Sequence, residues 1–88
     1  MNELILPLLK MDLDIHTTKR DEYLNTLILS AKEFIEEEGI TLGQSYGDTL
    51  LVEMYAAYLY RKRKEDVAMP RMLRSALNNR LLGGDKQC

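Results

Sequence analysis

The chain has 88 residues, the size of one domain (1–88), with 45% hydrophobic and 30% charged residues and a formal net charge of −2. Its single cysteine, Cys88, excludes an internal disulfide and fits a reducing compartment. The first ten residues lack the basic start of a secretory leader, and no apolar stretch reaches the ~18–20 residues that cross a bilayer, so we expect a soluble intracellular protein with no membrane partner.

The charge is unevenly distributed along the chain. Positions 1–60 carry four basic and eleven acidic side chains, whereas positions 61–88 carry eight basic and three acidic ones. Such an asymmetry favours association of unlike ends between copies of the chain, or contact with a polyanion.

The N-terminal segment contains Leu4, Ile5, Leu8 and Leu9, whose spacing indicates a short helix. Pro7 leaves its start open, because a helix can begin at a proline while residues 2–6 stay extended. We interpret Leu13 and Ile15, further along, as apolar contacts made from a loop.

The segment 21–38 has the clearest helical pattern, with apolar residues at i, i+3, i+4 and i+7. Thr18 is expected to cap its start, and Gly39 to end it in a left-handed conformation. The acidic residues Glu36, Glu37 and Glu38 occupy its last turn, where the helix dipole disfavours them. They are either a solvated face or an acidic patch that meets a basic partner.

The next helix is predicted from about Tyr46 or Asp48 to Lys64, with Ser45 or Asp48 as its cap. Its expected buried stripe contains Leu51, Met54, Tyr55, Tyr58 and Leu59, and Tyr60 falls off that stripe. A last helix is predicted from Pro70, with Leu73, Ala76, Leu77 and Leu81 on one face and a stop at Gly83–Gly84 before a short polar tail (83–88). No segment alternates with a period of two, so the expected fold is all-α, a bundle of about four helices.

No residue pattern predicts catalysis, a metal site or a cofactor. His16 is the only histidine, and Asp12 and Asp14 lack the glycine and glutamate spacing of a calcium loop. Gly39, Gly43 and Gly47 are not followed by the lysine and serine or threonine of a phosphate loop. We therefore expect a binding protein and not an enzyme.

The candidate binding residues lie in the C-terminal third. The basic run 61–64 either stabilises the end of its helix or faces nucleic acid or an acidic patch on another subunit. Arg71 and Arg74 share a helix face, and Asn78 and Asn79 are poor helix formers whose amides suit outside contacts. The predicted interface residues are Tyr60, Arg61, Arg63, Met69, Pro70, Arg71, Met72, Arg74, Asn78 and Asn79.

Four segments carry a resemblance to a known family: positions 8–15, 20–40, 48–63 and 69–81, of which Met-Pro-Arg-Met-Leu-Arg (69–74) is the most distinctive. The chain resembles the small head–tail connector proteins of tailed bacteriophages and prophages, also called head-completion or neck adaptor proteins. Pro7 departs from the usual first helix of that family.

The resemblance implies an all-α bundle that forms an oligomeric ring under the portal, extends the DNA channel and offers a docking surface to the tail or a stopper protein. It implies no enzymatic activity and no cofactor, contact with DNA in the channel that is at most nonspecific, and a place first in the host cytoplasm and then in the virion neck. The competing hypothesis is a small helical nucleic-acid-binding protein of packaging or regulation, which the acidic pI of about 5.3 disfavours.

Overall fold

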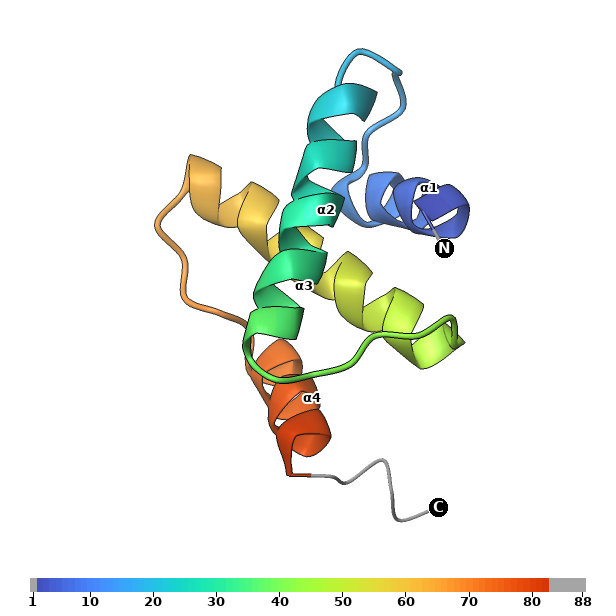
Figure 1. Ribbon diagram of the computed structural model, residues 1–88. Coiled ribbons are helices and arrows are strands. Elements are labelled where there is room, and N and C mark those ends of the chain that lie inside the picture. The colour runs from blue at the N-terminus through green and yellow to red at the C-terminus, as the bar shows by residue number, and fades with distance from the viewer. Residues whose placement is uncertain (1, 83–88) are drawn as a thin grey trace.

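The computed structural model describes residues 2–82, which form four α-helices joined by loops (Figure 1). They are α1 (Asn2–Leu13), α2 (Asp21–Glu37), α3 (Tyr46–Lys64) and α4 (Arg71–Leu81), and the described residues include no strand. The predicted all-α bundle is therefore confirmed. The expected helix stop at Gly83–Gly84, the polar tail and Cys88 lie outside the described residues.

The central element of the fold is α3, whose side chains are buried around most of its circumference. Val52, Ala56 and Ala57 are almost completely buried in it, and the fully buried Leu24 and Ile28 of α2 belong to the same core. The predicted single stripe was therefore too narrow, because α1, α2 and α4 all pack against this one helix.

The helix α1 runs without interruption from Asn2 to Leu13 and contains Pro7. The alternative of an extended segment before Pro7 is wrong. Ile5 and Leu9, on either side of the proline, are both fully buried, so packing against the core offsets the backbone hydrogen bond that proline cannot donate. Leu13 is the last residue of this helix, and Ile15 packs against the core from the following loop as expected.

The ends of α2 and α3 agree only in part with the expected caps. Gly39 has the predicted left-handed backbone, with φ of 103°, just after α2. The Ser45 hydroxyl accepts a hydrogen bond of 3.1 Å from the Asp48 amide and caps α3. The predicted cap by Thr18 is wrong, because α2 starts at Asp21, Arg20 occupies the cap position, and no side chain makes a capping hydrogen bond there.

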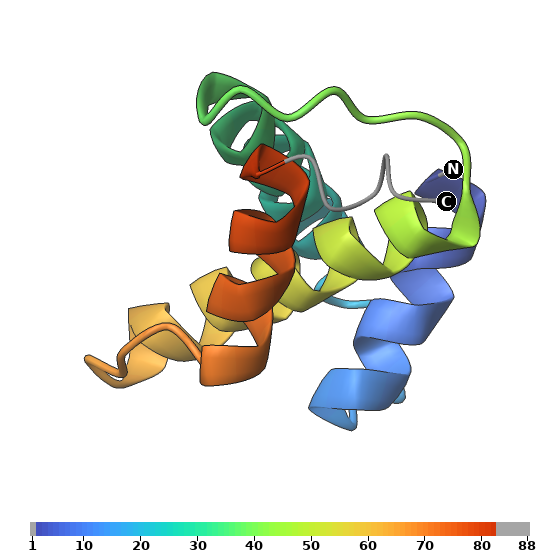
Figure 2. The same ribbon diagram turned by 90° about the horizontal axis from the view of Figure 1, so that it is seen from below.

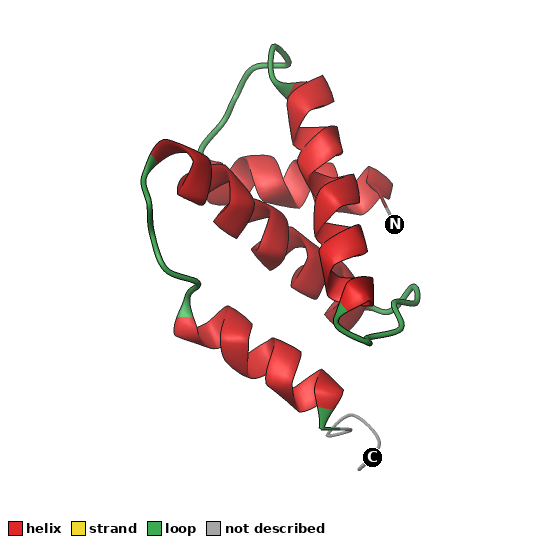
Figure 3. Ribbon diagram, turned by 60° about the vertical axis from the view of Figure 1, so that its left-hand side comes forward, coloured by secondary structure: helices red, strands yellow, loops and turns green. Residues whose placement is uncertain are grey.

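In the ribbon, α4 lies to one side of the other three helices and follows the loop 65–70 (Figure 3). Its first residue is Arg71, with Pro70 just before it, and it joins the core through two buried leucines, Leu73 and Leu77. At its C-terminal half Arg80 forms an ion pair with Asp48 of α3. This arrangement leaves much of α4 exposed.

Candidate interaction surfaces

The basic run at the end of α3 is exposed and lies on a group of tyrosines. The guanidinium of Arg63 is 5.0 Å from the ring centre of Tyr23 on α2, and the ammonium of Lys64 is 5.4 Å from that of Tyr60. A cation over an aromatic face is stabilised by ~0.5–1 kcal/mol at an exposed site. The run is thus attached to the surface of the bundle at the N-terminal end of α2. We call positions 20 and 61–64 the basic end.

Tyr60 lies beneath the side chains of the basic end and is not part of its exposed surface. Its side chain is 8% exposed, and its hydroxyl accepts a hydrogen bond of 2.8 Å from Arg20. Its ring centre lies 6.4 Å from that of Tyr23. The prediction that Tyr60 falls off the buried stripe was therefore wrong, because the start of α2 covers the side of α3 on which it lies.

The helix α4 presents two different faces to solvent. Arg71, Arg74 and Asn78 are exposed and lie on one side, since residues three and four apart are neighbours on a helix. Met72, 74% exposed, and Asn79 lie on the other side, next to α3. The predicted interface residues of α4 are accessible, and the fold divides them between two surfaces.

The residues that join α3 to α4 differ in exposure. Pro70 is exposed, whereas Met69 is half-buried and packs against the core. Pro70 also lines a small hollow beside Leu73, so both predicted residues have structural contacts of their own.

The acidic patch, Glu36, Glu37 and Glu38, is exposed at the C-terminal end of α2. Burial raises the pKa of Tyr55 beside it, the charge of Glu38 raises it further, and the charge of Arg74 opposes this rise. Arg74 and Glu38 therefore both lie close to Tyr55. The sequence separates these charges by more than thirty positions, yet the fold brings this part of α4 near the acidic patch.

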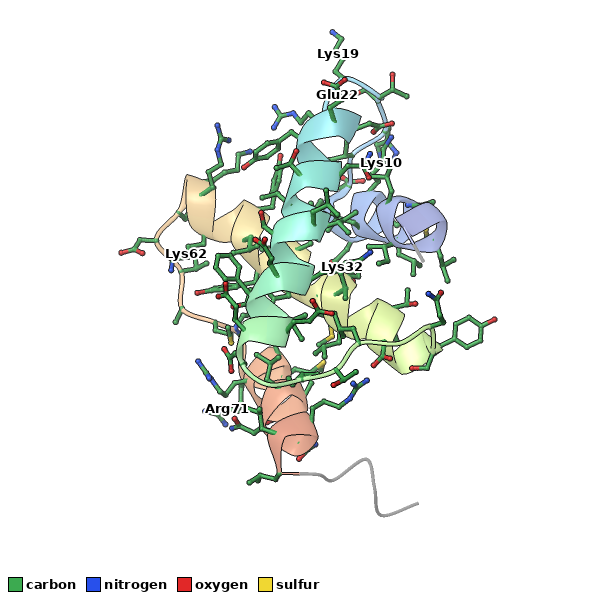
Figure 4. All side chains as sticks on the ribbon, viewed as in Figure 1. Lys10, Lys19, Glu22, Lys32, Lys62 and Arg71 are labelled. Carbon is green, nitrogen blue, oxygen red and sulfur yellow. The ribbon has the colours of Figure 1, made fainter. Side chains whose placement is uncertain are left out.

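The basic end and the acidic patch lie at opposite ends of α2. This helix has 17 residues, which corresponds to a length of about 25 Å. Figure 4 shows Lys19 and Glu22 at one end of α2 and Lys62 on α3. This separation is larger than the Debye length of about 8 Å at physiological salt. The charges at one end are therefore screened from those at the other, and each end interacts mainly with its own surroundings.

A carboxyl pair lies between α1 and α3, and sequence reasoning missed it. Glu53 is only 6% exposed and hydrogen-bonds through its side chain to Asp12, which also accepts a hydrogen bond of 3.1 Å from Nη2 of Arg61. The other oxygen of Glu53, Oε2, is buried and has no hydrogen-bond partner among the described residues. The signal was a single glutamate inside the apolar segment Leu51–Tyr55.

The two carboxyls of this pair hold protons differently. Burial, the hydrogen bond with Asp12 and the Asp12 charge together raise the pKa of Glu53 to about 8, and the charge of Arg61 opposes this. The hydrogen bond from Glu53 lowers the pKa of Asp12, burial acts against this, and Arg61 lowers it further. At neutral pH Glu53 is the protonated partner and donates its hydrogen bond to the Asp12 carboxylate.

A second, structural ion pair fixes the far end of α4. Burial opposes ionisation of Asp48, but the Gly43 amide, which donates a hydrogen bond of 2.7 Å, and Arg80 together lower the pKa of this carboxyl. Asp48 thereby links the loop before α3, the start of α3 and α4. Its role is to hold these elements together.

The described residues lack two kinds of feature, a cluster of metal-binding side chains and a helix able to span a membrane. They contain no group of three or more histidine, cysteine, aspartate or glutamate side chains that could hold an ion. His16 is exposed in a loop and pairs with Asp14 at 2.8 Å. Within residues 2–82, no helix has the length and apolar character needed to cross a membrane.

Comparison of the chain with protein-family models, with curated proteins and with solved structures gives no match. The resemblance to connector proteins thus depends on the four sequence segments described above, and the functional argument depends on the surfaces of the fold.

Proposed function

We propose that the chain is a non-enzymatic structural protein of a tailed phage or prophage, which forms an oligomeric ring at the head–tail interface, binds the portal and completes the DNA channel. The sequence resemblance supplies the biological setting. The observation that carries the assembly part is the placement of the basic end and the acidic patch at opposite ends of α2.

Unlike surfaces on opposite ends of one subunit favour a heterologous, head-to-tail contact, in which one surface of each copy meets a different surface of the next. Such contacts close into a ring when the rotation per subunit divides a full turn. In this proposal the basic end of one copy meets the acidic patch of its neighbour. The two arginines on the outer side of α4, Arg71 and Arg74, contact the portal or the neighbouring subunit.

The test is a pair of charge reversals with complementary effects. Glu37→Lys reduces the formal charge of the acidic patch from −3 to −1, and Arg63→Glu reduces that of the basic end from +5 to +3. Each variant alone should therefore form fewer oligomers than the wild type in light scattering. An equimolar mixture should recover them, because Glu37→Lys still has an intact basic end and Arg63→Glu still has an intact acidic patch. Glu22→Lys, at the other end of α2, is the control with the same change in net charge as Glu37→Lys.

Three further results decide between the proposal and its alternative. Association of wild-type chain with the portal ring encoded beside its gene supports the connector role. If both reversals assemble like the wild type, the proposed subunit contact is wrong. Tight, sequence-dependent binding of a DNA duplex at physiological salt would instead establish the nucleic-acid-binding alternative, since nonspecific phosphate contacts weaken steeply with salt.

A further inference from the structure

The helix α4 depends on α3 for nearly all of its packing. Its contacts with other helices are almost all with α3. Within α4 only Leu73 and Leu77 are buried, and Arg80 adds the ion pair with Asp48 of α3. The side of α3 that receives these residues is called here the α4 site.

The contact between α4 and its site is incomplete along the helix. A hollow of about 140 Å³ lies beside Met54, Met72 and Leu73, and another of about 310 Å³ lies beside Met54, Ala76 and Asn79. Both hollows border α4, so this helix is held mainly by its two leucines and by Arg80. Few contacts have to break for α4 to leave the site.

The loop that joins α3 to α4 has the features of a hinge. It consists of positions 65–70, and its backbone is extended at both ends, with φ and ψ of −137° and 140° at Glu65 and of −58° and 145° at Pro70. Val67 and Met69 are half-buried, the other four residues are exposed, and Val67 borders a third hollow of about 340 Å³. Figures 2 and 3 show this loop on the outside of the molecule. Fully stretched, a loop of this length spans about 20 Å, which would carry α4 away from its own chain.

The other terminal helix, α1, is attached in a different way. It packs against both α2 and α3, and its residues Ile5 and Leu9 are fully buried. Lys10 pairs with Asp21 of α2 at 2.8 Å, and Asp12 pairs with Arg61 of α3 at 3.1 Å. Removing α1 would therefore break contacts with two helices, whereas α4 can move while the other three stay packed.

We propose that α4 is exchanged between copies of the chain: it leaves the site on its own α3 and occupies the same site on α3 of a second copy. In the exchanged pair Leu73 and Leu77 are buried again, and Arg80 pairs with Asp48 of the second copy. Exchange of an identical element is a low-cost route to association, because each lost contact forms again between the chains.

Two copies are sufficient for this exchange, because each gives one helix and receives one. The occupant of the site is thus known from the structure, which shows how α4 fits α3, and the exchange changes only which chain supplies it. This contact is distinct from the one between the basic end and the acidic patch, and it does not depend on the ring.

The experiment cross-links two variants that each have one cysteine. Both chains carry Cys88→Ser; one adds Met54→Cys in the α4 site and the other adds Ala76→Cys on α4, two positions that line the same hollow. The folded chains are mixed at micromolar concentration and treated with a short bismaleimide. The two thiols share a hollow only in an exchanged pair, where their effective concentration is on the order of millimolar.

The mixture should therefore give at least about tenfold more covalent dimer than a control mixture of Leu29→Cys and Ala76→Cys chains, because Leu29 is exposed on α2. A yield no greater than that of the control would show that α4 stays on its own α3, and the proposal would be wrong.

Two added substitutions separate exchange from other kinds of association. Leu77→Asp in the Ala76→Cys chain prevents α4 from being buried in any site, so it should reduce the covalent dimer to the control level, and circular dichroism checks that this chain stays helical. Glu37→Lys in both chains weakens the proposed ring contact and should leave the yield unchanged. A yield that falls with Glu37→Lys and not with Leu77→Asp would mean that the chains meet through their charged ends and that α4 does not exchange.

Discussion

The two sides of α3 differ in how completely they are packed. On the α2 side, large apolar residues such as Ile28 and Ile35 are fully buried, and the cations at the edge lie on tyrosine rings. On the α4 side, two leucines and one ion pair hold a short helix whose neighbouring surface remains apolar and exposed. The comparison indicates that the α2 side contributes more to the stability of the fold, whereas the α4 side keeps more apolar surface exposed.

The largest effect should come from creating a cavity on the well-packed α2 side. Ile28→Ala should lower the free energy of unfolding by about 2–5 kcal/mol, the usual range for removing a fully buried aliphatic side chain. A domain of this size has a total stability on the order of 4–13 kcal/mol, so the variant should lose much of its cooperative unfolding transition. Urea denaturation followed by circular dichroism measures the change.

Leu77→Ala is the matched change on α4, where the side chain is equally buried. It should release α4 locally, so hydrogen exchange should accelerate in residues 71–81 while α1, α2 and α3 keep most of their protection. If Leu77→Ala instead accelerates exchange uniformly over all four helices, α4 is an integral part of the cooperative core and the comparison fails.

Sequence reasoning predicted the elements on the α2 side well, because they have strong local signals. The periodic apolar residues of 21–38, Gly39 and the Ser45 cap are all local features, and the structure confirms each of them. Thr18 gave a similar local signal, but its side chain makes no cap hydrogen bond. Local sequence patterns indicate which conformations a segment can adopt, and tertiary packing determines which of them forms.

The surfaces were harder to predict because they depend on which helices meet. Tyr60 would be exposed if α3 were an isolated helix. In the folded chain the start of α2 packs over it, and Arg20 donates a hydrogen bond to its hydroxyl. The pairing of Asp12 with Glu53 joins residues forty-one positions apart. No spacing within a single helix could have indicated that contact, although the acidic residue in an apolar segment was visible.

The next effect concerns the pH dependence of stability. The pKa of Glu53 is raised to about 8 in the folded chain from an ordinary value of 4.5, so the folded state holds more protons than the unfolded state between these values. Stability should therefore fall as the pH rises from 5 to 8, with a slope of at most ~1.4 kcal/mol per pH unit for one proton.

Glu53→Gln should flatten that slope, since its amide stays neutral and can still donate to Asp12. Thermal unfolding of both chains at pH 5, 6, 7 and 8 checks the prediction. The Asp12 pKa is lowered, so its contribution has the opposite sign and is lost only when the pH falls below the usual range of an aspartate. Parallel pH profiles of the wild type and Glu53→Gln would show that Glu53 ionises normally in the folded protein.

The smallest expected effect on stability is the loss of a helix cap, and it should differ between the two caps that the sequence indicated. Ser45→Ala removes the hydroxyl that accepts the hydrogen bond from the Asp48 amide, so it should reduce the free energy of unfolding by about 1 kcal/mol. Thr18→Ala should change it by less than about 0.5 kcal/mol, because Thr18 is exposed and only its backbone carbonyl, which the substitution keeps, bonds the Asp21 amide. Urea denaturation of both variants under identical conditions measures the difference. Equal losses would mean that Thr18 caps α2 in solution, and the start of α2 would then be stabilised by its own sequence and not only by its packing against α3.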